Sequence, residues 1–431
     1  MHLKELLTEG SIAFVLTIAG VLSGYVLTLL ITRNFGADVM GIFSLSTTVL
    51  TIASIFARFG LDTTLLRFVA EYSTQNRFDL VKEVYIKSLK IAILFSLILS
   101  ILFYVLSSFI ALNIFHKDYM ATYLKIVSFA ILPMVLLFMN AQSLRGLKKT
   151  SSYSFFQSVS IFLIASILIW SVSFFIRQDI VPVVSYVLSV FLSAVFSQLM
   201  WLKSSNLDAI SHSNFLKIPN ILSISLPMLL SSSMTFIMTW TDTILLGIYR
   251  TEAEVGLYNV ALRVSMVTAI TLIAVNSIAA PKFAEFYARR DVGGLEKIVR
   301  QSTKLIFWTS TPIIIVLALF PSFVLGIFGP EFKSGSGALR ILLCGQFVNV
   351  LSGSVGFILQ MTGKQKVFQK IIMLSMMFNI ALNMVFIPQY GINGAAIINI
   401  ISMALWNITS VIYIKRHYGI TTMYIPFMKI Y

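Results

Sequence analysis

Runs of about 20 apolar residues recur along the whole chain, separated by short segments that hold most of its charged residues. A helix of about 20 apolar residues is long enough to cross the ~30 Å hydrocarbon layer of a bilayer. Strands of a membrane barrel would instead alternate in polarity over about ten residues, whereas stretches such as Ile91 to Ile110 are apolar on every side. The pattern therefore predicts an all-α polytopic membrane protein.

Hydropathy, charge and turn residues together predict about twelve transmembrane helices. The first has an apolar part too long for a signal peptide, so we expect it to be retained. The expected spans are residues 11–32, 39–60, 86–112, 121–144, 153–176, 180–202, 219–249, 256–281, 303–328, 336–362, 367–388 and 391–414.

The composition supports this class and predicts the orientation of the spans. Only 11% of the residues are charged, 58% are hydrophobic and the mean hydropathy is +0.90. If the N-terminus is cytoplasmic, twenty-four of the 32 Lys and Arg residues fall in inner segments and seven in outer ones. Because basic residues accumulate in cytoplasmic loops, both termini are predicted to be cytoplasmic, and the net charge of +15 is no argument for a nucleic-acid partner.

Matching segments recur about 215 residues apart and predict an internal duplication. Gly41 and Gly256 occupy similar segments at this offset, and Leu124-Lys125-Ile126 matches Leu339-Arg340-Ile341. An offset that contains six spans preserves their direction, so we expect two parallel six-helix lobes, residues 1–215 and 216–431. Such lobes would enclose a central cleft.

The residues also resemble a known family. The stretches that carry the resemblance cover the chain from the first span to the last, and include Ile31 to Gly36, Asp242 to Gly247, Val255 to Arg263, Gly329-Pro330-Glu331, Leu359 to Lys364, Asn379 to Asn383 and Ile387 to Ala396. They look like polysaccharide-biosynthesis flippases of the Wzx type, which belong to the multidrug/oligosaccharidyl-lipid/polysaccharide (MOP) exporter superfamily.

The resemblance implies a function and a location. It implies a flippase in the cytoplasmic (inner) membrane that moves an undecaprenyl-diphosphate-linked oligosaccharide unit to the outer leaflet by alternating access, for O-antigen, capsule or exopolysaccharide assembly. A polysaccharide polymerase and a chain-length regulator are the implied protein partners. A multidrug or cation antiporter and a lipid II flippase stay open as alternatives from the same superfamily.

The sequence lacks the usual signatures of enzymes and resident cofactors. It has no Walker A loop, its four histidines show no metal-binding spacing, and Cys344 is its single cysteine. Outer loops are too short for a membrane-embedded glycosyltransferase or polymerase. We expect a protein that is not an enzyme and has no cofactor or metal site; a coupling ion, H+ or Na+, is not identified.

Two charged residues inside predicted spans are the leading site candidates, because an ionisable group in a bilayer is costly unless it is paired. Asp242 and Arg263 each lie about ten residues from a turn expected near Glu252 and Ala253, so the two are expected at similar depth. They form either a structural ion pair or a site where Arg263 meets the lipid diphosphate and Asp242 positions it or exchanges a proton. The offset of 215 places uncharged Leu27 and Thr48 at the equivalent positions.

Three other basic residues are expected near the outer side. Lys125 and Arg340 are equivalent under the repeat, and Arg33 lies at the end of the first span. Each either extends to the outer headgroups or lines the mouth of the cleft, where it would receive an anionic sugar or diphosphate. A cleft with such a rim would favour anions over cationic drugs.

Four secondary candidates complete the set. Arg58 and Asp62 lie one helical turn apart, which favours a local pair. Asn379 and Asn383 share one face of the eleventh span, where hydrogen bonding between helices explains them at least as well as sugar binding.

Overall fold

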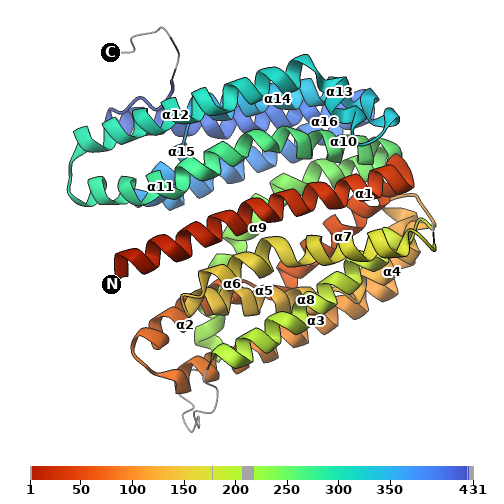
Figure 1. Cartoon of the computed structure of the whole chain (residues 1–431), viewed down its shortest axis with the longest axis horizontal. Coiled ribbons are helices and arrows are strands. Elements are labelled where there is room, and N and C mark those ends of the chain that lie inside the picture. Colours follow the sequence, from red (N-terminus) through yellow and green to blue (C-terminus); the bar gives the residue numbers. More distant parts are fainter. Residues whose placement is uncertain (1, 177, 206–217, 425, 427–431) are drawn as a thin grey trace. The chain divides into compact units, whose positions relative to one another are not determined.

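The computed structural model describes residues 2–176, 178–205, 218–424 and 426. Every regular element in these residues is a helix (Figure 1). The chain divides into two compact units, Met1–Phe236 and Ile237–Tyr431. The predicted lobe boundary at residue 215 lies outside the described residues, and the cleft between the lobes stays a prediction.

The first unit is built from long apolar helices joined by short turns. It contains α1 (His2–Arg58), α2 (Leu61–Thr74), α3 (Phe78–Asn113), α4 (Met120–Ser128), α5 (Ile131–Gly146), α6 (Thr150–Ser154), the π-helical turn Phe155–Val159, α7 (Ser160–Val172), α8 (Val181–Ser204) and the first part of α9 (Ile218–Tyr249).

The second unit begins within α9. It continues with α10 (Glu252–Ser265), a 3₁₀ turn at Met266–Thr268, α11 (Ala269–Ala288), α12 (Val292–Leu319), α13 (Pro321–Gly326), a 3₁₀ helix at Pro330–Gly335, α14 (Ser336–Ser352), α15 (Val355–Met361) and α16 (Gln365–Tyr418). Within this unit α14 packs against α12 and α16, and α11 packs against α12 and α15.

The helices account for the predicted number of spans. In the described chain seven helices are long and apolar enough to cross a membrane, or nine if each bent pair is one span. Two of these helices are broken by a glycine with non-helical backbone, α1 at Gly36 (φ 84°) and α16 at Gly391 (φ 56°), so each contains two of the predicted spans. With α9, whose residues Phe236–Tyr249 form a further apolar helix, the prediction of about twelve transmembrane helices is confirmed.

The turn between α1 and α2 depends on a glycine for two reasons. Gly60 has φ 71°, a left-handed conformation that side chains disfavour. A Cβ atom there would also lie 2.2 Å from the Ser225 carbonyl oxygen of α9. Gly60 therefore allows the backbones of the α1–α2 turn and α9 to approach closely in unit 1.

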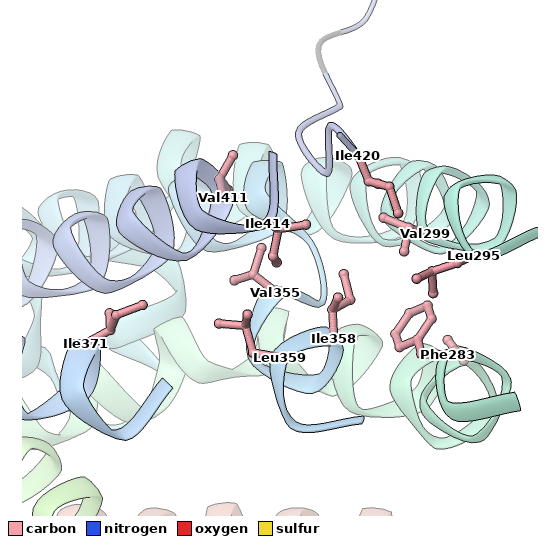
Figure 2. Packing of buried hydrophobic residues seen from close by; sticks show 11 residues of the cluster. Phe283, Leu295, Val299, Val355, Ile358, Leu359, Ile371, Val411, Ile414 and Ile420 are labelled. Atoms are coloured by element: carbon pink, nitrogen blue, oxygen red, sulfur yellow. The ribbon is translucent and has the colours of Figure 1, made fainter. Parts of the chain in front are cut away.

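A hydrophobic core fills one end of unit 2 (Figure 2). Figure 2 shows Ile420, which follows α16, pointing toward Val299 of α12, and the ring of Phe283 beside Leu295. Phe283 and Val299 are completely buried. The segment after α16 thus packs against the α11–α12 helical hairpin.

The contacts of Lys125 and Arg340, which the repeat makes equivalent, are consistent with the proposed duplication. Lys125 lies 5.9 Å from the ring centroid of Tyr104 in α3. Arg340 donates from Nε to the carbonyl oxygen of Ala318 in α12 at 3.4 Å. The offset of 215 maps Ala318 to position 103, next to Tyr104. The two basic residues therefore meet equivalent helices at the same level.

Candidate functional site

Unit 2 contains a carboxylate without any exposed surface, that of Asp242. Oδ2 of Asp242, in α9, accepts hydrogen bonds from the Tyr258 hydroxyl at 2.6 Å and from the Asn399 amide at 3.1 Å. Its Oδ1 accepts from the Asn383 amide at 2.7 Å. Asn379 is one turn from Asn383 and donates to the Ser402 hydroxyl at 3.1 Å. We call the first four residues, Asp242, Tyr258, Asn383 and Asn399, the carboxylate centre.

The four residues of the carboxylate centre lie at the same height along their helices, because the two residues of each pair are equally far from a turn. Asp242 lies eight residues before Arg250 and Tyr258 eight residues after it. Asn383 and Asn399 lie eight residues on either side of Gly391. Eight helical residues span about 12 Å, so each pair is level on two antiparallel helices. The positions of the turns, rather than any local motif, determine which side chains meet.

Arg250 joins the two turns. Its guanidinium donates from Nε to the Ile387 carbonyl oxygen at 3.1 Å and from Nη2 to that of Pro388 at 2.7 Å. These carbonyls belong to the end of the first half of α16, where helical partners are missing. Gly391 leaves room for Glu254 beside this contact, because a Cβ atom there would lie 2.8 Å from Glu254 Oε1. Arg250 therefore keeps the α9–α10 hairpin level with the α16 hairpin.

The contacts of Asp242 leave its negative charge uncompensated by any described residue. All three donors are neutral side chains. The remaining amide oxygens nearby, Oδ1 of Asn379 and of Asn383, are buried and have no hydrogen-bond partner in the structure. A buried carboxylate is expensive without a counter-charge. A carboxylate with adjacent amide oxygens fits a proton or a small monovalent cation, since hard cations prefer oxygen ligands.

An ion pair between Asp242 and Arg263, one of the two interpretations of the sequence, is not among the salt bridges of the described residues. Asp242 accepts hydrogen bonds from three neutral side chains, and Arg263 is half-buried on α10. The physical reason is the position of the turn. Because α9 ends at Tyr249 and α10 begins at Glu252, Tyr258 rather than Arg263 is level with Asp242.

The local pair between Arg58 and Asp62 is present. Arg58 Nη1 lies 3.1 Å from Asp62 Oδ2, and its Nε donates to the Ser54 carbonyl oxygen at 3.2 Å. The guanidinium also lies 4.4 Å from the ring centroid of Phe138. The charge of this buried arginine is thus paired within unit 1.

The other basic site residues predicted from the sequence differ in their surroundings. Arg340, in the same unit, is exposed and held by a carbonyl of α12. Lys125 is half-buried and Arg33 is exposed, both in unit 1. Their part in a cleft stays a prediction. Asn379 and Asn383 hydrogen-bond between helices, as the sequence favours.

Unit 1 has a buried polar centre of a different kind. The Tyr85 hydroxyl of α3 lies 2.7 Å from Asn140 Oδ1 and 3.0 Å from Gln198 Oε1. Asn140 donates to Ser197 at 3.2 Å and to Gln198 at 3.0 Å. All of these groups are neutral. The equivalents of the charged positions, Leu27 and Thr48, are buried and uncharged. The buried carboxylate of unit 1, Glu83, is instead paired with Lys87 at 2.7 Å.

Tyr258, Asn399 and Arg250 are absent from the residues predicted from sequence. One signal could have found Tyr258. Thr251 and Glu254 form a capping box, T-x-x-E, with the Thr251 hydroxyl accepting from the Glu254 amide at 3.4 Å. This motif places the start of α10, and counting eight residues either side of the turn then pairs Asp242 with Tyr258.

Comparison with solved structures identifies the fold. A multidrug resistance MATE family transporter of the MOP superfamily, in an inward-facing conformation, matches with a TM-score of 0.75 at 16% identity over 93% of this chain and 94% of that one. The lipid II flippase MurJ matches with a TM-score of 0.75 at 15% identity over 94% and 87%. The chain thus has the fold of MOP-superfamily transporters.

The family follows from the sequence. The model of the polysaccharide biosynthesis protein family matches residues 7–287, and the chain belongs to this family. A MatE model matches residues 227–385. The resemblance found in the sequence is therefore confirmed.

Three curated relatives share 23–27% of their aligned residues with this chain. The probable low-salt glycan biosynthesis flippase Agl15 of Haloferax volcanii is 23% identical over 54% of this chain and 50% of its own length. The probable flippase AglR of the same organism is 27% identical over 40% and 37%. The chain therefore aligns with half or less of these two relatives. An uncharacterised membrane protein of Methanocaldococcus jannaschii is 25% identical over 80% of this chain and 71% of its own length.

Proposed function

We propose that the chain is a flippase that moves a lipid-linked glycan across the membrane, and that the carboxylate centre couples this transport to a cation gradient. The family match and the name of Agl15, a probable low-salt glycan biosynthesis flippase, support glycan flipping. The name of AglR, a probable flippase, supports flippase activity. The observation that carries the coupling is the buried Asp242 carboxylate with three neutral donors. The cargo would be an undecaprenyl-diphosphate-linked oligosaccharide unit, delivered for surface polysaccharide assembly.

Coupling requires that binding of a proton or cation to Asp242 changes the contacts between the helices around it. The ion-free carboxylate accepts three hydrogen bonds from α10 and from both halves of α16. A proton or Na+ on the same oxygens would replace some of these donors and let the unpartnered amide oxygen of Asn383 turn toward the cation. Loading would therefore change contacts among three helical segments, and a ligand shifts a conformational equilibrium through such differential contacts.

The test is a flipping assay with the full chain reconstituted in liposomes that contain a lipid-linked oligosaccharide. A membrane-impermeant glycosidase reports how much glycan reaches the outer leaflet, with or without a proton or Na+ gradient. We expect gradient-dependent flipping by the wild type and its loss in Asp242→Asn. Asp79→Asn is the matched control, since Asp79 pairs with Arg77 at 3.2 Å on the surface. Equal, gradient-dependent flipping by Asp242→Asn and the wild type would refute the coupling role.

A cation or drug antiporter is the second candidate. The MatE model matches residues 227–385, a range that includes Asp242 and Asn383. Extrusion of a cationic dye from the same liposomes, with no flipping of the glycan lipid, would favour this candidate over the flippase.

A further inference from the structure

The helix pair α14 and α15 is bent by 43° at a break that contains Gly353. Gly353 has φ 72°, and a Cβ atom there would lie 2.2 Å from the Thr303 hydroxyl oxygen of α12. The break therefore packs directly against α12. Thr303 and Ser354, which follows the glycine, are both buried, and neither hydroxyl has a hydrogen-bond partner among the described residues.

Asn276 of α11 lies level with Thr303 in the antiparallel α11–α12 hairpin. One contact gives the alignment of the two helices, because the Ser310 hydroxyl of α12 donates to the Thr268 carbonyl oxygen at 3.3 Å. Asn276 comes eight residues after Thr268, and Thr303 comes seven residues before Ser310. Both side chains are thus about 11 Å along their helices from this contact.

Asn276 and Thr303 also extend the hydrophobic core of Figure 2 by one polar layer. Asn276 lies three residues before Ala279 and Thr303 four residues after Val299, so each shares a helix face with a core residue. Val355, which follows the break, belongs to the same core. Asn276 is buried, and neither its amide nitrogen nor its amide oxygen has a hydrogen-bond partner in the described chain.

The segment after α16 adds Thr422 to this layer. Ile420, two residues before Thr422, packs in the core of Figure 2 beside α12. Tyr424, two residues after it, has its ring centroid 5.2 Å from that of Phe307, one turn beyond Thr303 in α12. Thr422 is therefore level with Thr303. It is buried, and its hydroxyl also lacks a partner among the residues that the structure describes.

Four segments of unit 2 thus bring buried polar atoms without partners to one level, and we call their residues Asn276, Thr303, Ser354 and Thr422 the polar layer. Such a concentration indicates an ordered water or an ion, because buried polar groups in proteins are nearly always hydrogen-bonded. The four side chains are neutral, and hydroxyls and amides can both donate and accept, as the partners of a buried water do. A cation is disfavoured, because the layer contains no carboxylate and the exposed Lys304 follows Thr303 directly.

We propose that ordered water occupies the polar layer and solvates the break at Gly353. Water can satisfy the polar groups that a break in a membrane helix frees. It accepts from the Asn276 amide and connects this amide to the three hydroxyls of the layer, so one network joins α11, α12, the break and the segment after α16. The Tyr424 amide holds that segment in place by donating to the Leu351 carbonyl oxygen at 3.2 Å. No residue of the carboxylate centre takes part, so the test does not depend on the proposed function.

The first test is the direction in which Tm changes, measured on the purified full chain. If water bonds to Asn276, Asn276→Leu expels it and leaves the three hydroxyls unpaired, and Tm should fall by about 5 °C. A dry layer gives the opposite direction, a rise of about 5 °C, because leucine then removes an unpaired amide and adds apolar burial.

A second variant excludes crowding by leucine as the cause. Thr303→Val keeps the shape of the side chain and should also lower Tm, by about 3 °C. Thr268→Val is the matched control, because Thr268 is equally buried in unit 2 but its hydroxyl donates to the Ser265 carbonyl oxygen of its own turn at 2.8 Å. It should leave Tm close to that of the wild type. A Tm for Thr303→Val at or above the wild-type value would overturn the proposal, whatever the leucine variant does.

A salt series separates water from a cation. Tm is measured in sodium, potassium and choline chloride in an Asp242→Asn background, which removes the charge of the carboxylate centre. Water in the layer predicts equal Tm values in the three salts. A Tm that rises with Na+ or K+, and no longer does so once Asn276→Leu is added, would identify a cation site and overturn the proposal. So would an experimental structure that resolves ordered water but places none within hydrogen-bond distance of Asn276.

Discussion

Substitution of Asp242 by leucine or asparagine should affect stability very differently. Leucine leaves three donors inside unit 2 without an acceptor, those of Tyr258, Asn383 and Asn399. Each buried unsatisfied donor costs about 1–3 kcal/mol, and burying the leucine side chain returns about 2 kcal/mol. The middle of this range is a net loss of about 4 kcal/mol for Asp242→Leu.

Asparagine should be tolerated, because the carboxylate centre can rearrange around it. The new amide keeps one oxygen, which can accept from Tyr258 and Asn399. Its NH₂ group can donate to Asn383 once that side chain turns and presents Oδ1, which is buried without a partner. The desolvation cost of the charge also disappears. The expected change in the free energy of unfolding for Asp242→Asn is within about 1 kcal/mol.

The assay is thermal unfolding of the purified full chain, followed by intrinsic tryptophan fluorescence. A loss of about 4 kcal/mol corresponds to a fall in Tm of roughly 10 °C for a cooperative unit of this size. Asn407→Leu is the matched control, because Asn407 is also fully buried in unit 2 but, among the described residues, donates only to the Met403 carbonyl oxygen one turn away. It should change Tm by only a few degrees, about 1 kcal/mol.

Two outcomes would refute the reasoning. If Asp242→Leu unfolds at the wild-type temperature, the three donors do not depend on the carboxylate. If Asp242→Asn loses as much stability as Asp242→Leu, the amide of Asn383 does not turn, and the negative charge itself is required for packing.

Three further substitutions test the contacts that hold each unit together. Arg250→Lys loses the two hydrogen bonds from the guanidinium to the α16 carbonyls, and is expected to lower the free energy of unfolding by about 1–3 kcal/mol. A Tm equal to that of the wild type would show that these two hydrogen bonds do not stabilise the protein. Gly60→Ala places a Cβ against the Ser225 carbonyl at a left-handed position, so we expect little folded protein by size-exclusion chromatography, and a monodisperse wild-type yield would contradict this. Tyr85→Phe removes the hydroxyl that contacts Asn140 and Gln198, and is expected to cost about 1 kcal/mol of stability. Flipping should stay intact. Loss of flipping in a folded variant would show that the polar centre of unit 1 is functional.

The prediction of Asp242 as a functional candidate and the error about its partner have the same origin. Hydropathy shows that a carboxylate lies inside a span, and the cost of its burial makes it a candidate without further information. Its partner depends on the exact residue at which the chain turns. An error of two residues in the turn between α9 and α10 changes the level by about 3 Å on each helix, and this selects Arg263 instead of Tyr258.

The sequence by itself determined the membrane class, the spans and the buried carboxylate. These features depend on local composition, because each span must be apolar over its own length to enter the bilayer. The glycines that break α1 and α16 could be placed between neighbouring apolar runs for the same reason. Only the tertiary structure decided that Asn383 and Asn399 reach Asp242 across 141 and 157 residues of chain, and that Arg250 joins the two turns. Such contacts depend on the rotation and level of packed helices, which hydropathy does not encode.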